Sequence, residues 1–213
     1  FALTALEGHF TFSRDSAIGN LVTFFNRQID PLVIGKMLGA TPLGLYSMAN
    51  RLAILPSQLL AAPAQSTMYV KMVALRHDIA ALRDLVLISS LAVAILVFPP
   101  MAIAAASSHA FFVVFLSAKW ADASLLFAIL APVAGIQVVS TIWTPMLLAT
   151  ENTTLRLRIG IEMTVLWLAI LPFAAMHGVV AVVVAYVVSY MAFSLLRSYN
   201  AFLSPVQLNV LDM

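Results

Sequence analysis

Residues Leu85 to Ala106 read LVLISSLAVAILVFPPMAIAAA, an apolar stretch without a charged side chain. A helix needs about 20 mostly apolar residues to cross the hydrocarbon core of a bilayer, and this stretch is long enough. A membrane-spanning strand would be about 10 residues long and would alternate apolar with polar side chains, which this stretch does not do. It therefore predicts a transmembrane helix and indicates an all-α membrane protein.

The composition of the whole chain agrees with that prediction. Of its 213 residues, 62% are hydrophobic and 9% are charged, and the mean hydropathy is +1.02. Soluble domains are about 45–50% apolar and about 25% charged, and a domain of this size has too little interior to bury so many apolar side chains. The chain has no Cys, 8 Gly and 10 Pro, which excludes disulfide-rich and collagen-like classes. Its 11 basic residues are too scattered for nucleic-acid binding.

Six apolar stretches are long enough to cross a membrane, which predicts a single six-helix transmembrane lobe over residues 1–213. The predicted spans are about 16–38, 43–70, 79–106, 122–149, 155–176 and 179–203. Residues 111–116 are apolar but too short to cross, so we expect an interfacial or re-entrant segment. Prolines inside these spans each remove a backbone hydrogen bond, so the helices either bend between states or carry static kinks. These prolines are Pro56, Pro63, Pro132, Pro145 and Pro172.

The distribution of basic residues orients the chain, because Lys and Arg concentrate on the cytoplasmic side of membrane proteins. With the N-terminus inside, seven basic residues lie on the inner side: Arg14, Lys71, Arg76, Arg83, Arg156, Arg158 and Arg197. Only Lys36 and Lys119 lie on the outer side. We therefore predict a multi-pass protein in which both termini of this segment are cytoplasmic.

Polar side chains within the spans recur at helical spacing, so several helices each carry one polar stripe. Because a charge at mid-bilayer costs roughly 2.5–3.5 kcal/mol on insertion scales, such residues usually face a bundle interior or a wet cavity. We therefore expect the stripes to line a hydrated cavity that contains two fixed cations. The residues predicted to line it are Arg27, Asp30, Asn50, Arg51, Gln58, Gln65, Gln137 and Thr141.

Structural roles for the same residues remain open alternatives. Arg27 and Asp30 are three positions apart and could neutralise each other. Arg51 could extend to the interface along its aliphatic stem. Glu162 could either pair with Arg158 on the same helix face or bind a coupling ion. The Gln and Ser stripes could serve as hydrogen bonds between helices rather than as ligand contacts.

Sequence motifs of enzymes and of metal or cofactor sites are missing. The four His residues fall in loops or at termini without a second ligand at metal spacing, so we expect no metal. There is no Gly-rich phosphate loop, Ser/His/Asp set, paired carboxylates or HExxH motif. An enzyme embedded in the membrane would show a larger external loop than residues 107–120. We therefore expect no enzymatic activity and no cofactor.

Two neighbouring motifs resemble the signature of a known family. Residues 26–40 read NRQIDPLVIGKMLGA, and residues 43–52 read LGLYSMANRL and are followed by Leu55-Pro56. Their order and spacing are similar to the polysaccharide transporter (PST) family, the Wzx and WzxC-type bacterial flippases of the MOP superfamily. The chain departs from the family pattern at Ser117, at Glu151-Asn152 and at Met68-Tyr69-Val70. These departures concern local turn geometry.

The resemblance implies that the chain is the C-terminal half of a transporter with two six-helix lobes, since the signature opens the second lobe. Its partner would be the missing N-terminal lobe of the same protein; a truncated product is the alternative. The family translocates oligosaccharide linked to undecaprenyl diphosphate across the bacterial inner membrane, for lipopolysaccharide or exopolysaccharide synthesis, by alternating access. The only other expected partners are membrane lipids.

The resemblance also implies roles for individual residues. Arg27 and Arg51 would attract the diphosphate, and Asp30 would either hold Arg27 or, like Glu162, take part in ion coupling. Gln58, Gln65, Gln137 and Thr141 would form hydrogen bonds with sugar hydroxyls. The rival interpretations are a MATE-like exporter of small molecules on the same fold and an inactive remnant. Exporters of cationic drugs favour acidic cavities, whereas the leading residues here are two arginines and one aspartate.

Overall fold

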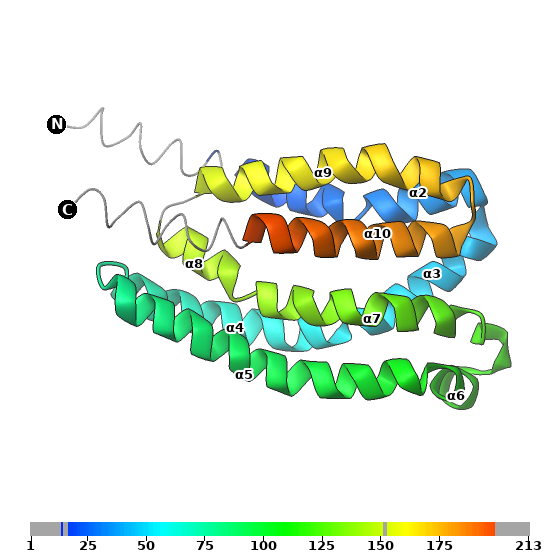
Figure 1. Ribbon diagram of the computed structural model, residues 1–213, viewed down its shortest axis with the longest axis horizontal. Helices are drawn as coiled ribbons and strands as arrows, with labels where there is room; N and C mark the ends of the chain where they lie inside the picture. The colour runs from blue at the N-terminus through cyan, green and yellow to red at the C-terminus, as the bar shows by residue number, and fades with distance from the viewer. Residues whose placement is uncertain (1–13, 15–16, 151–152, 199–213) are drawn as a thin grey trace.

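The computed structural model describes Arg14 and residues 17–150 and 153–198 of the chain. All the regular structure in these residues is helical, without a strand, which confirms the expected all-α class. The long helices run along one axis in an elongated bundle, and the short helix α6 (Ser108–Phe111) lies across one end of it (Figure 1). The interfacial segment expected at residues 111–116 forms the end of α6 and a single π-helical turn, η1 (Phe112–Leu116).

Four of the described helical segments are long and apolar enough to cross a membrane: Ile79–Ala106, Ala123–Ala149, Thr154–Ala175 and Val179–Leu196. They coincide with the third to sixth predicted spans. The elements that form them are α5 (Ile79–Ala106), α7 (Ala123–Ser140), α8 (Trp143–Ala149), α9 (Thr153–Ala175), α10 (Val179–Phe193) and the π-helical turn η3 (Ser194–Ser198). A short 3-10 turn, η2 (Ala118–Trp120), precedes α7. The part of the sixth predicted span beyond residue 198 lies outside the described residues.

The first two predicted spans are each divided into two helices. The first consists of helical residues 17–26 followed by α2 (Ile29–Leu38), with a turn at residues 27–28. The second consists of α3 (Ala40–Ala53) and α4 (Leu55–Ala74), separated at Ile54. Whether these broken segments cross the membrane stays a prediction.

A proline lies within three residues after the end of each break. Proline has no N–H to donate to the carbonyl four residues earlier, and its ring crowds that carbonyl. Pro31 stands four residues after Arg27, Pro56 four after Leu52, and Pro145 four after Thr141, where α7 gives way to α8. Other prolines, Pro99, Pro100, Pro132 and Pro172, lie within continuous helices. The side chain of Pro63 lies outside the described residues.

The central helix of the bundle is α7, which packs against α3, α4, α5 and α10. In its apolar span 50% of the residues are buried, against 17–22% in the other three spans. A helix that is apolar all round is buried on all sides, and small residues such as Ala131 and Ala134 let neighbouring helices approach. At Gly135 the absence of a side chain lets Phe98 of α5 pack directly against α7, since a Cβ at Gly135 would lie 2.9 Å from Cε1 of Phe98.

The outer surface of the bundle is largely apolar. On α5 the side chains of Ile88, Leu91 and Ile95 are 67%, 62% and 65% exposed, and their spacing places them on one helix face. Large exposed apolar surfaces of this kind are expected where a helix faces lipid rather than water. The described chain is thus a membrane protein by both hydropathy and packing.

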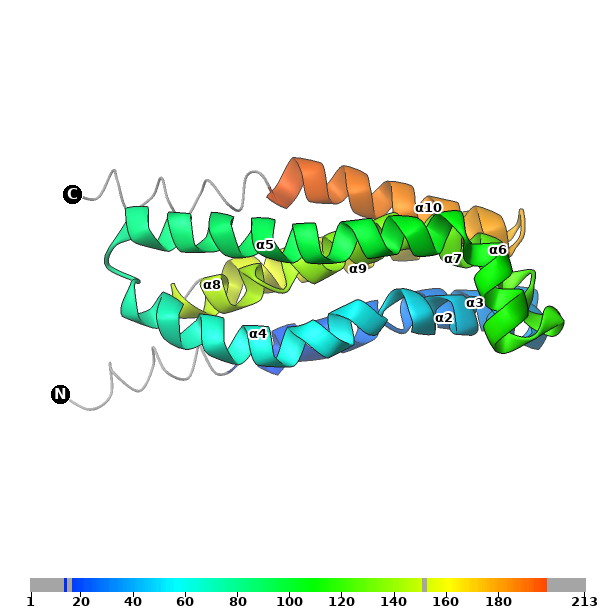
Figure 2. The same ribbon diagram turned by 90° about the horizontal axis from the view of Figure 1, so that it is seen from below.

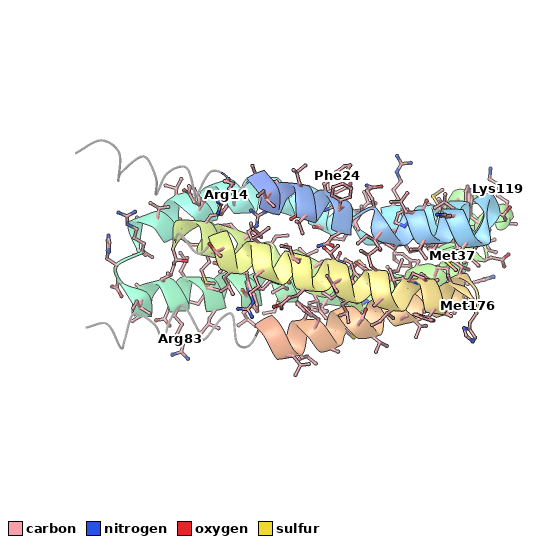
Figure 3. All side chains as sticks on the ribbon, turned by 90° about the horizontal axis from the view of Figure 1, so that it is seen from above. Arg14, Phe24, Met37, Arg83, Lys119 and Met176 are labelled. Carbon is pink, nitrogen blue, oxygen red and sulfur yellow. The ribbon has the colours of Figure 1, made fainter. Side chains whose placement is uncertain are left out.

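The two ends of the bundle differ in charge. Arg14 and Arg83 lie at the end where α4 connects to α5 and α9 begins, whereas Met37, Lys119 and Met176 lie at the opposite end, close to α6 (Figure 3). We call the first of these the basic end. It also holds the last turn of α4 with Lys71, the α4–α5 connection with Arg76, and the first turns of α9. Its cytoplasmic orientation stays a prediction from the positive-inside rule.

Candidate functional site

Three of the predicted site residues lie on the surface of the bundle rather than in its interior. The side chains of Arg27, Arg51 and Gln58 are exposed, and each lies within four residues of a helix break in the first two spans. The helices of these two spans form one side of the bundle, while α5 and α10 form the opposite side (Figure 2). We define the polar surface as five exposed polar side chains within seven residues of the breaks in these spans: Arg27, Gln28, Ser47, Arg51 and Gln58.

The two arginines of the polar surface lie at a similar depth. Arg27 and Arg51 are each 12 positions from Gly39, which separates α2 from α3 at the end of the bundle near α6. A helical rise of about 1.5 Å per residue places both about 18 Å along their helices from that end. Whether Arg51 extends along its aliphatic stem to the interface stays a prediction.

Asp30 is turned into the bundle, away from the polar surface. It is 5% exposed, and the Tyr46 hydroxyl donates a hydrogen bond to its Oδ2 atom across the α2–α3 interface. Among the described residues Asp30 has no ion pair with Arg27, so the structure does not support the alternative that the two side chains neutralise each other. The turn at residues 27–28 breaks the helical register that would have placed the two side chains on one face.

Two of the remaining predicted residues, Gln137 and Thr141, form hydrogen bonds inside the bundle. Gln137 Nε2 donates to the Tyr186 hydroxyl at 2.8 Å, which confirms the alternative of a hydrogen bond between helices. Thr141, the C-cap residue of α7, donates from its Oγ1 to the Val138 carbonyl in the last turn of that helix at 2.6 Å. Asn50 is half-buried on α3. The side chain of Gln65 lies outside the described residues.

Glu162 accepts a hydrogen bond from Arg158 Nε at 3.0 Å, an ion pair between positions four apart on α9. The structural alternative for Glu162 is therefore confirmed, and its role in ion coupling stays a prediction. Within the part of the chain that the structure describes, no three His, Asp or Glu side chains gather where they could hold a metal ion.

A cavity of about 310 Å³ lies among the helical residues 17–26, the α7–α8 junction, α9 and the end of α10. Its polar lining consists of Thr23, Asn26, Ser140, Thr144, Arg156, Tyr190 and Ser194. The rest of its wall consists of Trp143, Met146, Leu147, Ile159, Gly160, Met163, Trp167 and Phe193. We call this cavity the Arg156 pocket. It is a second polar feature, separate from the polar surface.

None of the predicted site residues lines the Arg156 pocket, although the polar stripes indicate part of it. Thr23, Ser140, Thr144 and Tyr190 are polar side chains within the first, fourth and sixth predicted spans, and the first three stand at helical spacing from Arg27, Gln137 or Thr141. Arg156 was predicted only as one of the basic residues on the inner side, because hydropathy places it at the start of a span. The only signal that could have found it is its position in the first turn of a span rather than in the preceding loop.

The wall of the pocket is held together by contacts between the helical residues 17–26 and α9. Asn26 Nδ2 donates to the Gly160 carbonyl at 3.1 Å, and Asn26 Oδ1 lies 2.6 Å from the Thr164 hydroxyl, which donates to it. Arg156 Nη2 donates to Asn20 Oδ1 at 3.1 Å. These bonds join residues more than 130 positions apart and fix the width of the cavity on this side.

The close approach of these two helices depends on a glycine. A Cβ at Gly160 would lie 3.0 Å from Cγ1 of Val22, and a β-branched side chain in a helix has little freedom to move aside. We expect Gly160→Leu to force the helices apart and to lower the free energy of unfolding by about 1–2 kcal/mol, measured by thermal unfolding in detergent. Gly44→Leu is the matched control, since a Cβ at Gly44 has no neighbour within 4 Å. Equal melting temperatures of the two variants would contradict this packing.

Comparisons with known proteins bear on the N-terminal part of the chain. A family model described as "Polysaccharide biosynthesis protein" matches residues 1–125, which is more than half of the 213 residues. The match contains both broken spans, the polar surface and α5. None of the curated proteins and none of the solved structures compared with the chain matches it.

Proposed function

Because the chain belongs to the polysaccharide biosynthesis protein family, we propose that it forms one lobe of a flippase for lipid-linked oligosaccharides. The cargo is a sugar repeat unit on undecaprenyl diphosphate, moved across the bacterial inner membrane for lipopolysaccharide or exopolysaccharide synthesis. The observation that carries this proposal is the polar surface, with its two exposed arginines on two broken spans, each 12 positions from Gly39.

The chemistry of the cargo explains why such a surface is needed. A diphosphate and several sugars cannot enter hydrocarbon unaided, since polar groups without hydrogen bonds cost several kcal/mol each to desolvate. Arginine presents a planar fork of donors that matches phosphate oxygens. On the polar surface Arg27 and Arg51 would bind the diphosphate, while Ser47 and Gln58 would form hydrogen bonds with sugar hydroxyls.

The exposure of these arginines also supports a two-lobe arrangement. Placing two guanidinium groups against the hydrocarbon of lipid tails costs free energy. The polar surface therefore requires water or another polar protein surface opposite it. We propose that the N-terminal lobe of the same protein supplies that opposite surface and that the two lobes rock around the cavity between them. In transporters of this kind, broken helices form the binding site near the midplane. Translocation makes and breaks no covalent bond, so we propose no enzymatic activity.

The test is deletion of the gene, followed by mass spectrometry of lipid extracts with surface polymer measured in parallel. The flippase predicts that the complete lipid-linked repeat unit accumulates on the inner leaflet and that surface polymer is lost. Normal polymer together with unchanged lipid-linked sugar would contradict it. If the deletion then altered drug susceptibility, the chain would belong to an exporter of small molecules, a role that the buried position of Asp30 does not favour.

A further inference from the structure

The guanidinium of Arg156 is a cation in the wall of the Arg156 pocket that no carboxylate neutralises among the described residues. Its hydrogen bond there goes to the neutral amide oxygen of Asn20, at 3.1 Å. Its neighbour Arg158, two positions further along α9, is by contrast paired with Glu162 at 3.0 Å. Arginine has five N–H donors, so most of those on Arg156 are available to a ligand that enters the pocket.

The position of Arg156 along α9 sets the depth of this charge. It lies in the first turn of α9, at the basic end of the bundle (Figure 1). The apolar stretch long enough to cross a membrane begins at Thr154, two residues before Arg156, so we infer that the guanidinium lies close to the boundary between headgroups and hydrocarbon. The N-terminus of a helix adds a partial positive charge at the same place.

One wall of the pocket is apolar, although Asn26, Ser140 and Tyr190 also line it. Along α9 its lining passes from Arg156 to Ile159, Met163 and Trp167, progressively deeper in the span, while Met146 and Leu147 line it from α8. A volume of about 310 Å³ is at the small end of ligand sites, which run from about 300 to 1,000 Å³. It accommodates a phosphate group and the first few carbons of a chain, and it is too small for an oligosaccharide.

From the cavity, the unpaired guanidinium and its depth, we propose that the Arg156 pocket binds the phosphate group of an anionic membrane phospholipid. Arg156 holds the phosphate, and the start of an acyl chain lies against Ile159 and Leu147. Basic pockets between transmembrane helices at the cytoplasmic side are suited to anionic headgroups. This site is separate from the polar surface, so it does not depend on the proposed transport function.

The tryptophans of the chain offer a direct probe of this site. Two of its three tryptophans, Trp143 and Trp167, line the pocket, while Trp120 lies in η2 at the opposite end of the bundle. A Trp120→Phe chain in micelles of phosphatidylcholine would be titrated with phosphatidylglycerol brominated on its acyl chains. We expect saturable quenching of the fluorescence, and we expect Arg156→Gln to require about tenfold more brominated lipid, since it removes one charged hydrogen-bonding partner.

Matched variants distinguish an effect of the Arg156 charge on lipid binding from an effect of the overall charge of the protein. Arg158→Gln removes a cation two positions away and should titrate like the parent, while Arg156→Lys should retain most of the binding. Ser194→Leu fills the pocket from η3 and leaves Arg156 in place; it should weaken quenching, which keeps the test valid if Arg156→Gln folds poorly.

Three results would overturn the proposal. Quenching that is equal in the parent and in Arg156→Gln would exclude the guanidinium as the ligand. Equal quenching by brominated diacylglycerol, which has no phosphate, would reduce the site to an apolar groove. Displacement of phosphatidylglycerol by millimolar inorganic phosphate would assign the site to free phosphate rather than to lipid.

Discussion

The double variant Arg27→Ala/Arg51→Ala is expected to abolish polymer export while leaving the amount of protein in the membrane normal. Both side chains are exposed, so their removal leaves no cavity and no unpaired buried group in the lobe. A hydrogen bond to a charged group contributes about 1.5–3 kcal/mol. The loss of one arginine should therefore weaken binding of the diphosphate about tenfold or more, and the loss of both about 100-fold. Surface polymer and lipid-linked precursor would be measured in a deletion strain that carries the complete protein.

Two further variants make this prediction specific to the polar surface. Arg83→Ala removes an exposed arginine at the basic end and should leave export unchanged. Arg27→Lys/Arg51→Lys keeps both charges without the planar fork and should restore part of the export. If polymer output stays normal in the double alanine variant, the diphosphate does not bind at these arginines.

Tyr46→Phe is expected to destabilise the lobe by about 3 kcal/mol, because it leaves the Asp30 carboxyl buried without its donor. Tyr46 is 1% exposed, so water has little access to replace the lost hydroxyl. Asp30→Leu leaves the Tyr46 hydroxyl unpaired in the same way. Unfolding free energies of the purified chain, measured in detergent, would give both values.

The double variant Asp30→Leu/Tyr46→Phe distinguishes a local pair from a general loss of packing. It removes both partners of the hydrogen bond, so it should be clearly more stable than the sum of the two single changes predicts. Strict additivity would mean that the two side chains do not interact. A loss of export at normal stability in Asp30→Leu would instead favour the ion-coupling role predicted for Asp30.

The length and apolarity of individual helices could be read directly from the sequence. The third span was predicted at 79–106 and is α5, Ile79–Ala106, and the fifth was predicted at 155–176 and is α9, Thr153–Ala175. Such predictions succeed because a bilayer requires about 20 apolar residues in succession, which is a property of neighbouring positions in the chain. The difference in charge between the two ends of the bundle could also be read from the sequence, because it depends on which connecting segments carry Lys and Arg.

The breaks in the first two spans could be predicted from the sequence only in part. Their cause is in the sequence, since Pro31 stands three residues after the turn at residues 27–28 and Pro56 two residues after Ile54. Prolines within continuous helices, such as Pro132 and Pro172, show that this signal alone is ambiguous. The outcome depends on whether neighbouring helices can support the unpaired carbonyl, which is a tertiary property.

By itself the sequence determined the class of the protein, most of its spans and the presence of polar residues at membrane depth. Only the tertiary structure decided which of those residues are buried and with which partner. Asp30 bonds to Tyr46 instead of Arg27, and Asn26 meets a carbonyl at Gly160, 134 positions away. The physical reason is that apolar length is encoded locally, whereas a buried polar group takes its partner from whichever helix packs against it.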